Sequence, residues 1–179
     1  MAEAFSNKLT RAAGIVTTSS SGAVGITSTI ITGISTVGVA VSDLVVNANF
    51  IAGTKVTELG ASSVTVDRTS TNTTASTSQS VSFLGPTTAY TSAAATKSVL
   101  IGGTFANNTD NSVNLTVEVR DQSTAVSVAI ASKIPVPAGS SFVISDVGKT
   151  LLEATDEVVV YCDSANAIDA NLSVLTGVN

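Results

Sequence analysis

Histidine is absent from the 179 residues, which removes the side chain that most often serves as a general base or metal ligand near neutral pH. Tryptophan is also absent, and aromatic residues make up only 4% of the chain. Because carbohydrate sites usually contain exposed aromatic rings, this shortage disfavours a sugar-binding role. We therefore expect a protein that is not an enzyme and that needs no cofactor and no metal.

Cysteine occurs once, as Cys162, so no disulfide can form within the chain. We interpret Cys162 as a small residue buried in a strand rather than as a reactive thiol. The first eight residues lack the basic and apolar regions of a signal peptide, which favours synthesis in a reducing cytoplasm. No run of eighteen apolar residues occurs, so we expect no membrane span.

Charge is scarce as well, because only 12% of the residues are charged, against about a quarter in typical domains. The net charge is −5 and no cluster of Lys or Arg occurs, which excludes a nucleic-acid partner. Hydrophobic residues make up 44% of the chain. A surface with so little charge favours burial in a homo-oligomer or another symmetric assembly.

The second half of the chain shows the alternation of buried strands. In residues 113–120, hydrophobic residues alternate strictly with polar ones, and residues 126–130 and 168–174 repeat the pattern. Seven or eight short strands without an intervening helix predict an all-β fold, with an antiparallel, jelly-roll-like β-sandwich over residues 86–179. Gly102-Gly103 interrupts one of these strands and predicts a bulge.

Residues 15–85 predict a smaller β subdomain that precedes this sandwich. After short strands in residues 15–32, four apolar runs follow at close spacing, separated by turn residues, which indicates a meander or small barrel. These runs lie at residues 37–41, 44–46, 55–59 and 63–67. The polar, low-complexity residues 69–80 predict a flexible loop, with contact to a partner as the alternative.

Two segments are candidates for contact with other molecules. Residues 1–14 predict an N-terminal arm, in extended or helical form, whose Phe5 and Leu9 would anchor elsewhere. The second segment contains Pro135 and Pro137, which exclude a central strand and indicate an edge strand or a crossing between sheets. The interface candidates are Phe5, Leu9, Pro135, Val136 and Pro137.

Two polar clusters could carry chemistry. Glu153, Asp156 and Glu157 lie close together, but turn formers surround them, so we interpret them as solvated turn carboxylates rather than a glycosidase pair. Residues 107–111 offer oxygen ligands for calcium. They lack the Asp-x-Asp-x-Asp-Gly pattern and a following bidentate Glu, so a β-turn is the favoured interpretation.

Several segments resemble small virion proteins of tailed bacteriophages, most closely those of cyanophages. They are residues 4–9 (AFSNKL), 98–109 (SVLIGGTFANNT), 133–141 (KIPVPAGSS) and 152–160 (LEATDEVVV). Residues 49–57 (NFIAGTKVT) are similar to the Ile-x-Gly-Thr-x-Val hairpins of phage structural proteins. The resemblance implies an antiparallel β fold and a structural role in a virion, without an active site.

Two functions follow as expectations. The first is a non-enzymatic virion subunit of the capsid surface (decoration or cement) or of the neck or tail. It would be made in the host cytoplasm, and its partners would be copies of itself and other virion proteins. The alternative is a carbohydrate- or receptor-binding module at a fibre or capsid surface.

Overall fold

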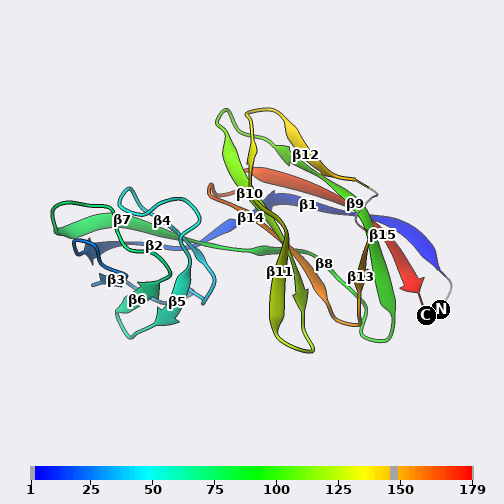
Figure 1. The fold of residues 1–179 in the computed structure, drawn as a ribbon, viewed down its shortest axis with the longest axis horizontal. Coiled ribbons are helices and arrows are strands. Elements are labelled where there is room, and N and C mark those ends of the chain that lie inside the picture. Colours follow the sequence, from blue (N-terminus) through cyan, green and yellow to red (C-terminus); the bar gives the residue numbers. More distant parts are fainter. Residues whose placement is uncertain (1–2, 146–148, 179) are drawn as a thin grey trace. The chain divides into compact units, whose positions relative to one another are not determined.

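The computed structural model describes residues 3–145 and 149–178, and within them every strand pair is antiparallel and no residue is helical. The chain divides into two compact units. Residues 1–14 and 86–179 form the first, called here the sandwich unit, and Ile15–Gly85 form the second, called here the inserted unit (Figure 1). The all-β, antiparallel prediction is confirmed, whereas its jelly-roll form stays a prediction.

The sandwich unit contains two sheets. The five-stranded sheet has the order β1 (Ala4–Ala13), β15 (Ile168–Val178), β9 (Lys97–Asn107) and β12 (Ser141–Ile144), with β13 (Thr150–Leu152) also paired to β9. The four-stranded sheet has the order β11 (Val126–Val136), β10 (Val113–Asp121), β14 (Glu157–Cys162) and β8 (Thr87–Thr91). Because side chains alternate along each strand, one set from each sheet fills the core, including Leu100, Phe105, Leu115, Val117 and Leu172.

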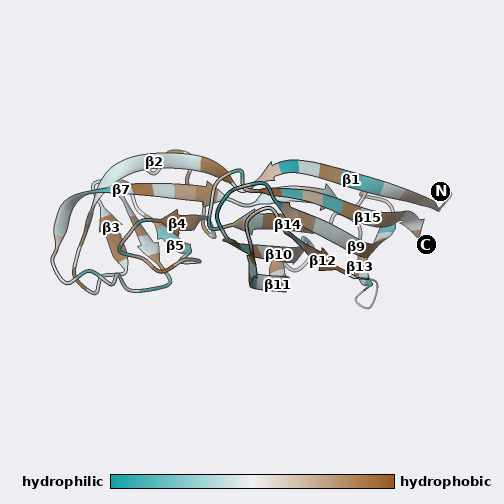
Figure 2. Cartoon of the chain, turned by 90° about the horizontal axis from the view of Figure 1, so that it is seen from above, coloured by the Kyte–Doolittle hydropathy of each residue, from teal (hydrophilic) through white to brown (hydrophobic). Residues whose placement is uncertain are grey.

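The N-terminal segment is not an arm, and this prediction is wrong. Residues 4–13 form β1, which pairs with β15 from Ala4 opposite Thr176 to Ala13 opposite Ile168. Phe5 and Leu9 are four residues apart, and residues at this spacing share a face in a strand as well as in a helix. The spacing alone could therefore not decide between them. The ribbon of β1 shows hydrophobic and hydrophilic residues in succession (Figure 2).

The segment that contains Pro135 and Pro137 is both an edge strand and a crossing between sheets, the two alternatives that the sequence left open. It ends β11, which lies at an edge of the four-stranded sheet, and the chain then crosses to β12 in the other sheet. Pro135 lies opposite Asn114 of β10. An edge position accommodates proline because only one side of the strand needs backbone donors.

The irregularity predicted at Gly102-Gly103 lies one residue earlier, at Ile101, whereas both glycines are regularly paired with β15. The register of β9 with β15 shifts between the pairs Gly102–Ser173 and Leu100–Val174. A β-carbon at position 102 would lie 2.8 Å from the carbonyl oxygen of Ile144, so the neighbouring backbone approaches too closely for a side chain.

The inserted unit is a small closed barrel. Its strand order is β4 (Leu44–Val46), β7 (Ser76–Gly85), β2 (Ile15–Val24), β3 (Ile30–Thr32), β6 (Ser63–Val66) and β5 (Val56–Leu59). The amide of Val45 donates to the carbonyl of Thr54 at 2.8 Å, and the amide of Val56 donates to Asp43 at 2.9 Å. These bonds join β4 to the residues that lead into β5, so the two edge strands of the sheet meet and the sheet closes. The core includes Val24, Ile31, Val64, Val81 and Phe83.

Three local expectations for the inserted unit are wrong. Residues 15–24 form one continuous strand, whereas residues 37–41 form turns rather than a strand. Gly38 has φ 82°, and the carboxylate of Asp43 accepts a hydrogen bond from the amide of Ala40 at 2.9 Å, which together favour a turn. The polar segment 69–80 is not one flexible loop, because Ser76 begins β7 and the buried Ser70 hydroxyl donates to the carbonyl of Gly25 at 2.7 Å.

Candidate functional site

The carboxylate cluster near residue 153 shapes a turn. Asp156 is buried, so the expectation of a solvated carboxylate is wrong for this residue. Its carboxylate accepts hydrogen bonds from the amides of Gln122 at 3.3 Å and Glu153 at 3.0 Å. Within residues 3–145 and 149–178, no three Asp, Glu, Cys or His side chains gather in a way that could hold a metal ion.

The asparagine-rich segment is a turn, as interpreted from its sequence. The side-chain amide of Asn107 donates to the carbonyl oxygens of Asn111 at 2.7 Å and Val136 at 2.9 Å. Its Oδ1 accepts from the amide of Thr109 at 2.9 Å. The oxygen that could serve as a calcium ligand therefore already closes the turn.

The pKa values of Cys162 and Asp121 are shifted, and neither group forms a reactive centre. Burial raises the pKa of the Cys162 thiol, which disfavours the nucleophilic thiolate. Cys162 is buried at the end of β14, as the sequence indicated. Hydrogen bonds from the Ser123 and Thr124 hydroxyls lower the pKa of Asp121 to about 2, and these residues form one exposed turn after β10.

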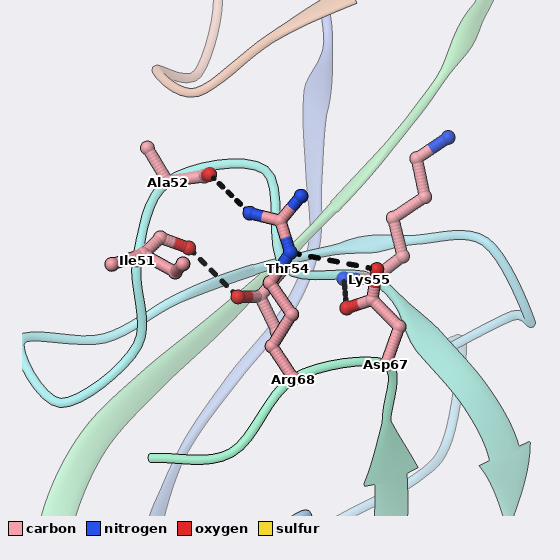
Figure 3. Close-up of polar contacts among 6 residues, drawn as sticks. All are labelled: Ile51, Ala52, Thr54, Lys55, Asp67 and Arg68. Carbon is pink, nitrogen blue, oxygen red and sulfur yellow. Dashed lines mark hydrogen bonds and ion pairs between the residues drawn. The ribbon is translucent and has the colours of Figure 1, made fainter. Parts of the chain in front are cut away.

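The Ile-x-Gly-Thr-x-Val motif is also a turn (Figure 3). The hydroxyl of Thr54 donates to the carbonyl of Ile51 at 2.7 Å. Asp67 accepts from the amide of Lys55 at 2.8 Å, and Arg68 donates to the carbonyl of Ala52 at 3.1 Å. The residues of the motif therefore form the turn that precedes β5, and we assign no binding site to them.

The aromatic side chains provide little stacking surface. Tyr90, Tyr161, Phe83 and Phe105 are buried, whereas Phe5 is 78% exposed. A sugar platform usually needs an exposed ring beside polar groups that converge on the ligand. Phe5 instead belongs to a broad apolar surface.

The outer face of the five-stranded sheet carries two cross-strand rows. Their positions follow from strand pairing, because residues directly opposite each other point to the same side of a sheet. In row A, Phe5 lies opposite Leu175, Leu175 opposite Val99, and Val99 opposite Leu151. Row B lies four residues along β1 and contains Leu9, Asn171, Thr104 and Val143. We call this surface, with Ile101 between the rows, the open face.

The open face is apolar and exposed. Leu9 is 77% exposed, Val143 and Leu151 are at least half exposed, and Val99, Ile101 and Leu175 are partly exposed. Two shallow hollows of about 390 and 250 Å³ lie on it. Both include Thr104 and Asn171, and small residues of β9 leave them unfilled. Apolar side chains thus gather along row A and at both ends of row B, with the exposed Asn171 and Thr104 between those ends. An exposed cluster of apolar side chains rimmed by polar residues is typical of a protein interface.

The five interface candidates do not form one site. Phe5 and Leu9 lie on the open face, but Pro135 and Pro137 are exposed at the end of the edge strand β11 and beyond it. Val136 is only 1% exposed and packs in the core, so its selection as a contact residue is wrong. Strand alternation explains this, because Val136 points inward between two outward-pointing prolines.

Sequence reasoning missed the other members of the open face. These residues, Val99, Val143, Leu151 and Leu175, each have a hydrophobic neighbour on at least one side, so the sequence does not show which residue of each run faces outward. Only the register with β1 and β9 places them beside Phe5 and Leu9.

No protein-family model matches the chain, and neither a curated protein nor a solved structure is significantly similar to it. None of the described residues lies in a helix that could span a membrane.

Proposed function

We propose that the chain is a non-enzymatic structural protein of a tailed-phage virion, present as a repeated subunit of the capsid surface or of the neck or tail. The observation that carries this proposal is the open face, where apolar side chains from β1, β15, β9, β12 and β13 are exposed together. The scarcity of charge and the resemblance of residues 98–109 and 133–141 to phage virion proteins support it.

The geometry of the open face suits a repeated contact. Burying one Leu or Phe side chain contributes about 1.5–3 kcal/mol, so a few such residues make a modest contact. In a symmetric particle the same contact recurs many times, and the linked contacts reinforce one another.

The proposal is tested on purified particles of the phage that encodes the chain. Quantitative mass spectrometry is expected to detect the chain in stoichiometric, multiple copies, and antibody labelling should place it at one part of the particle. Its absence from particles, with abundant free chain in the lysate, would contradict the proposal. Specific binding of the purified chain on a glycan array would favour the receptor-binding alternative.

A further inference from the structure

We infer that the open face binds the open face of a second copy of this chain, with the two copies related by a two-fold axis. The inference rests on the proposed function, which assigns this face to contacts within an assembly. It adds the identity of the partner, a second copy of the chain. Three properties of the face support it, namely the placement of its apolar rows, the charges at its ends and its size.

Row A, which is apolar, and row B, which is apolar only at its two ends, lie on either side of a polar middle row. Asn7, Ser173 and Gly102 lie opposite one another across β1, β15 and β9, midway between rows A and B. A two-fold axis along this middle row would lay row A of one copy on row B of the other. Phe5 would then meet Leu9 of the second copy, and Leu151 would meet Val143. Between these apolar pairs, Leu175 and Val99 would meet the uncharged polar residues Asn171 and Thr104. Such self-complementarity is the requirement of a symmetric dimer interface.

The charges on the same strand follow this symmetry. Glu3 and Arg11 are exposed, carry opposite charges and lie four residues on either side of Asn7. The same rotation brings Glu3 of one copy to Arg11 of the other. At the far end of row A, Lys97 and Glu153 already neutralise each other through an ion pair of 3.0 Å. The interface would thus have an uncharged centre and a charged rim, as stable interfaces do.

The size of the face is sufficient for a dimer. Nine residues of strand span about 30 Å and four paired strands span about 19 Å, so the footprint is roughly 570 Å² per copy. Two copies would cover roughly 1,100 Å², which exceeds the approximately 1,000 Å² expected of a specific interface. Face-to-face packing of two sheets is also a common arrangement in proteins.

The test measures self-association of the full chain by sedimentation equilibrium. We expect a dimer at about 100 µM, and we expect Leu9→Glu to raise the dissociation constant by about a hundredfold or more, since the charge would be buried without a partner. The matched control is Val128→Glu. Val128 is 60% exposed, but it lies on β11 of the other sheet, so the dimer should persist.

A charge exchange tests the axis without changing the apolar rows. Arg11→Glu should raise the dissociation constant about threefold to tenfold, because two like-charge contacts would form in each dimer. The double variant Glu3→Arg with Arg11→Glu should restore association to within about twofold of the original. Circular dichroism of each variant checks that the fold is intact.

Several outcomes would overturn the inference. They are a chain that is monomeric at about 100 µM, a Leu9→Glu variant that is folded and still dimeric, loss of the dimer in Val128→Glu, or failure of the double variant to associate. These results are separable from those of the virion experiment. A dimer that is absent from particles contradicts only the proposed function, whereas a monomer that is present in particles contradicts only this inference.

Discussion

In the sandwich unit, the side chain of Asn107 joins two separate segments of the chain. Its buried amide donates to the carbonyls of Asn111, Val136 and Pro137, and its oxygen accepts from the amide and hydroxyl of Thr109. The single side chain therefore holds the turn after β9 against the end of β11. The sequence indicated a turn here, but four Asn and Asp residues lie between 107 and 111. Burial in the folded structure distinguishes Asn107 from the other Asn and Asp residues of this segment.

Replacing Asn107 with Ala should lower the free energy of unfolding by about 2–3 kcal/mol, because buried carbonyls would lose their donor. Asn108→Ala is the matched control, since Asn108 is exposed and its change should be within about 0.5 kcal/mol. Urea titration followed by circular dichroism measures both. Equal stabilities of the two variants would contradict a structural role for the Asn107 amide.

At the scale of elements, β1 contributes to the fold chiefly through its backbone pairing and presents Phe5 and Leu9 outward. Its pairing with β15 covers an edge that would otherwise be open, and Ala13 lies in the core. Phe5 and Leu9, in contrast, make little contact within the chain, since both are more than three-quarters exposed. Loss of the strand and loss of its outward side chains should therefore have different consequences.

Deletion of residues 3–13 should destabilise the sandwich unit by about 3 kcal/mol or more, which corresponds to a fall of more than about 10 °C in its unfolding midpoint. The double variant Phe5→Ser with Leu9→Ser should change stability by no more than about 0.5 kcal/mol per site. Thermal unfolding of dilute protein, under conditions where no association occurs, compares them. An unchanged midpoint after the deletion would restore the interpretation of this segment as an arm.

At the scale of the whole molecule, the chain enters and leaves the inserted unit at two residues that are neighbours in space. Ile15 pairs with Gly85 in the register of β2 with β7. On the side of the sandwich unit, the amide of Gly14 donates to the Thr87 hydroxyl at 2.8 Å. Each unit also has a core of its own. Closely spaced ends and separate cores are the conditions under which a domain tolerates removal of an insertion.

A chain in which a short Gly-Ser linker replaces residues 15–85 should therefore fold, with cooperative unfolding and a β-rich circular dichroism spectrum. The isolated fragment 15–85 should also fold, because its barrel closes on itself. A shortened chain that is unfolded, while the intact protein is stable, would show that the sandwich unit depends on the insertion.

The sequence by itself determined the properties that depend on neighbouring residues. Strict alternation in residues 113–120 specified a strand, paired prolines specified an edge, and Gly102-Gly103 located a strand irregularity to within one residue, since each acts through local backbone geometry. The positions of residues 15–85 and 86–179 as separate stretches followed from the same local signals.

Only the tertiary structure decided which side of each strand meets the core and which strands lie together. Alternation shows that Phe5 and Leu9 share a side, but pairing with β15, more than 150 residues later, decides that this side is the open one. Val136 shows the same limit, because its core position depends on the sheet that packs against β11. Faces are built from residues distant in sequence, so the surface on which both proposals depend exists only once the strands are paired.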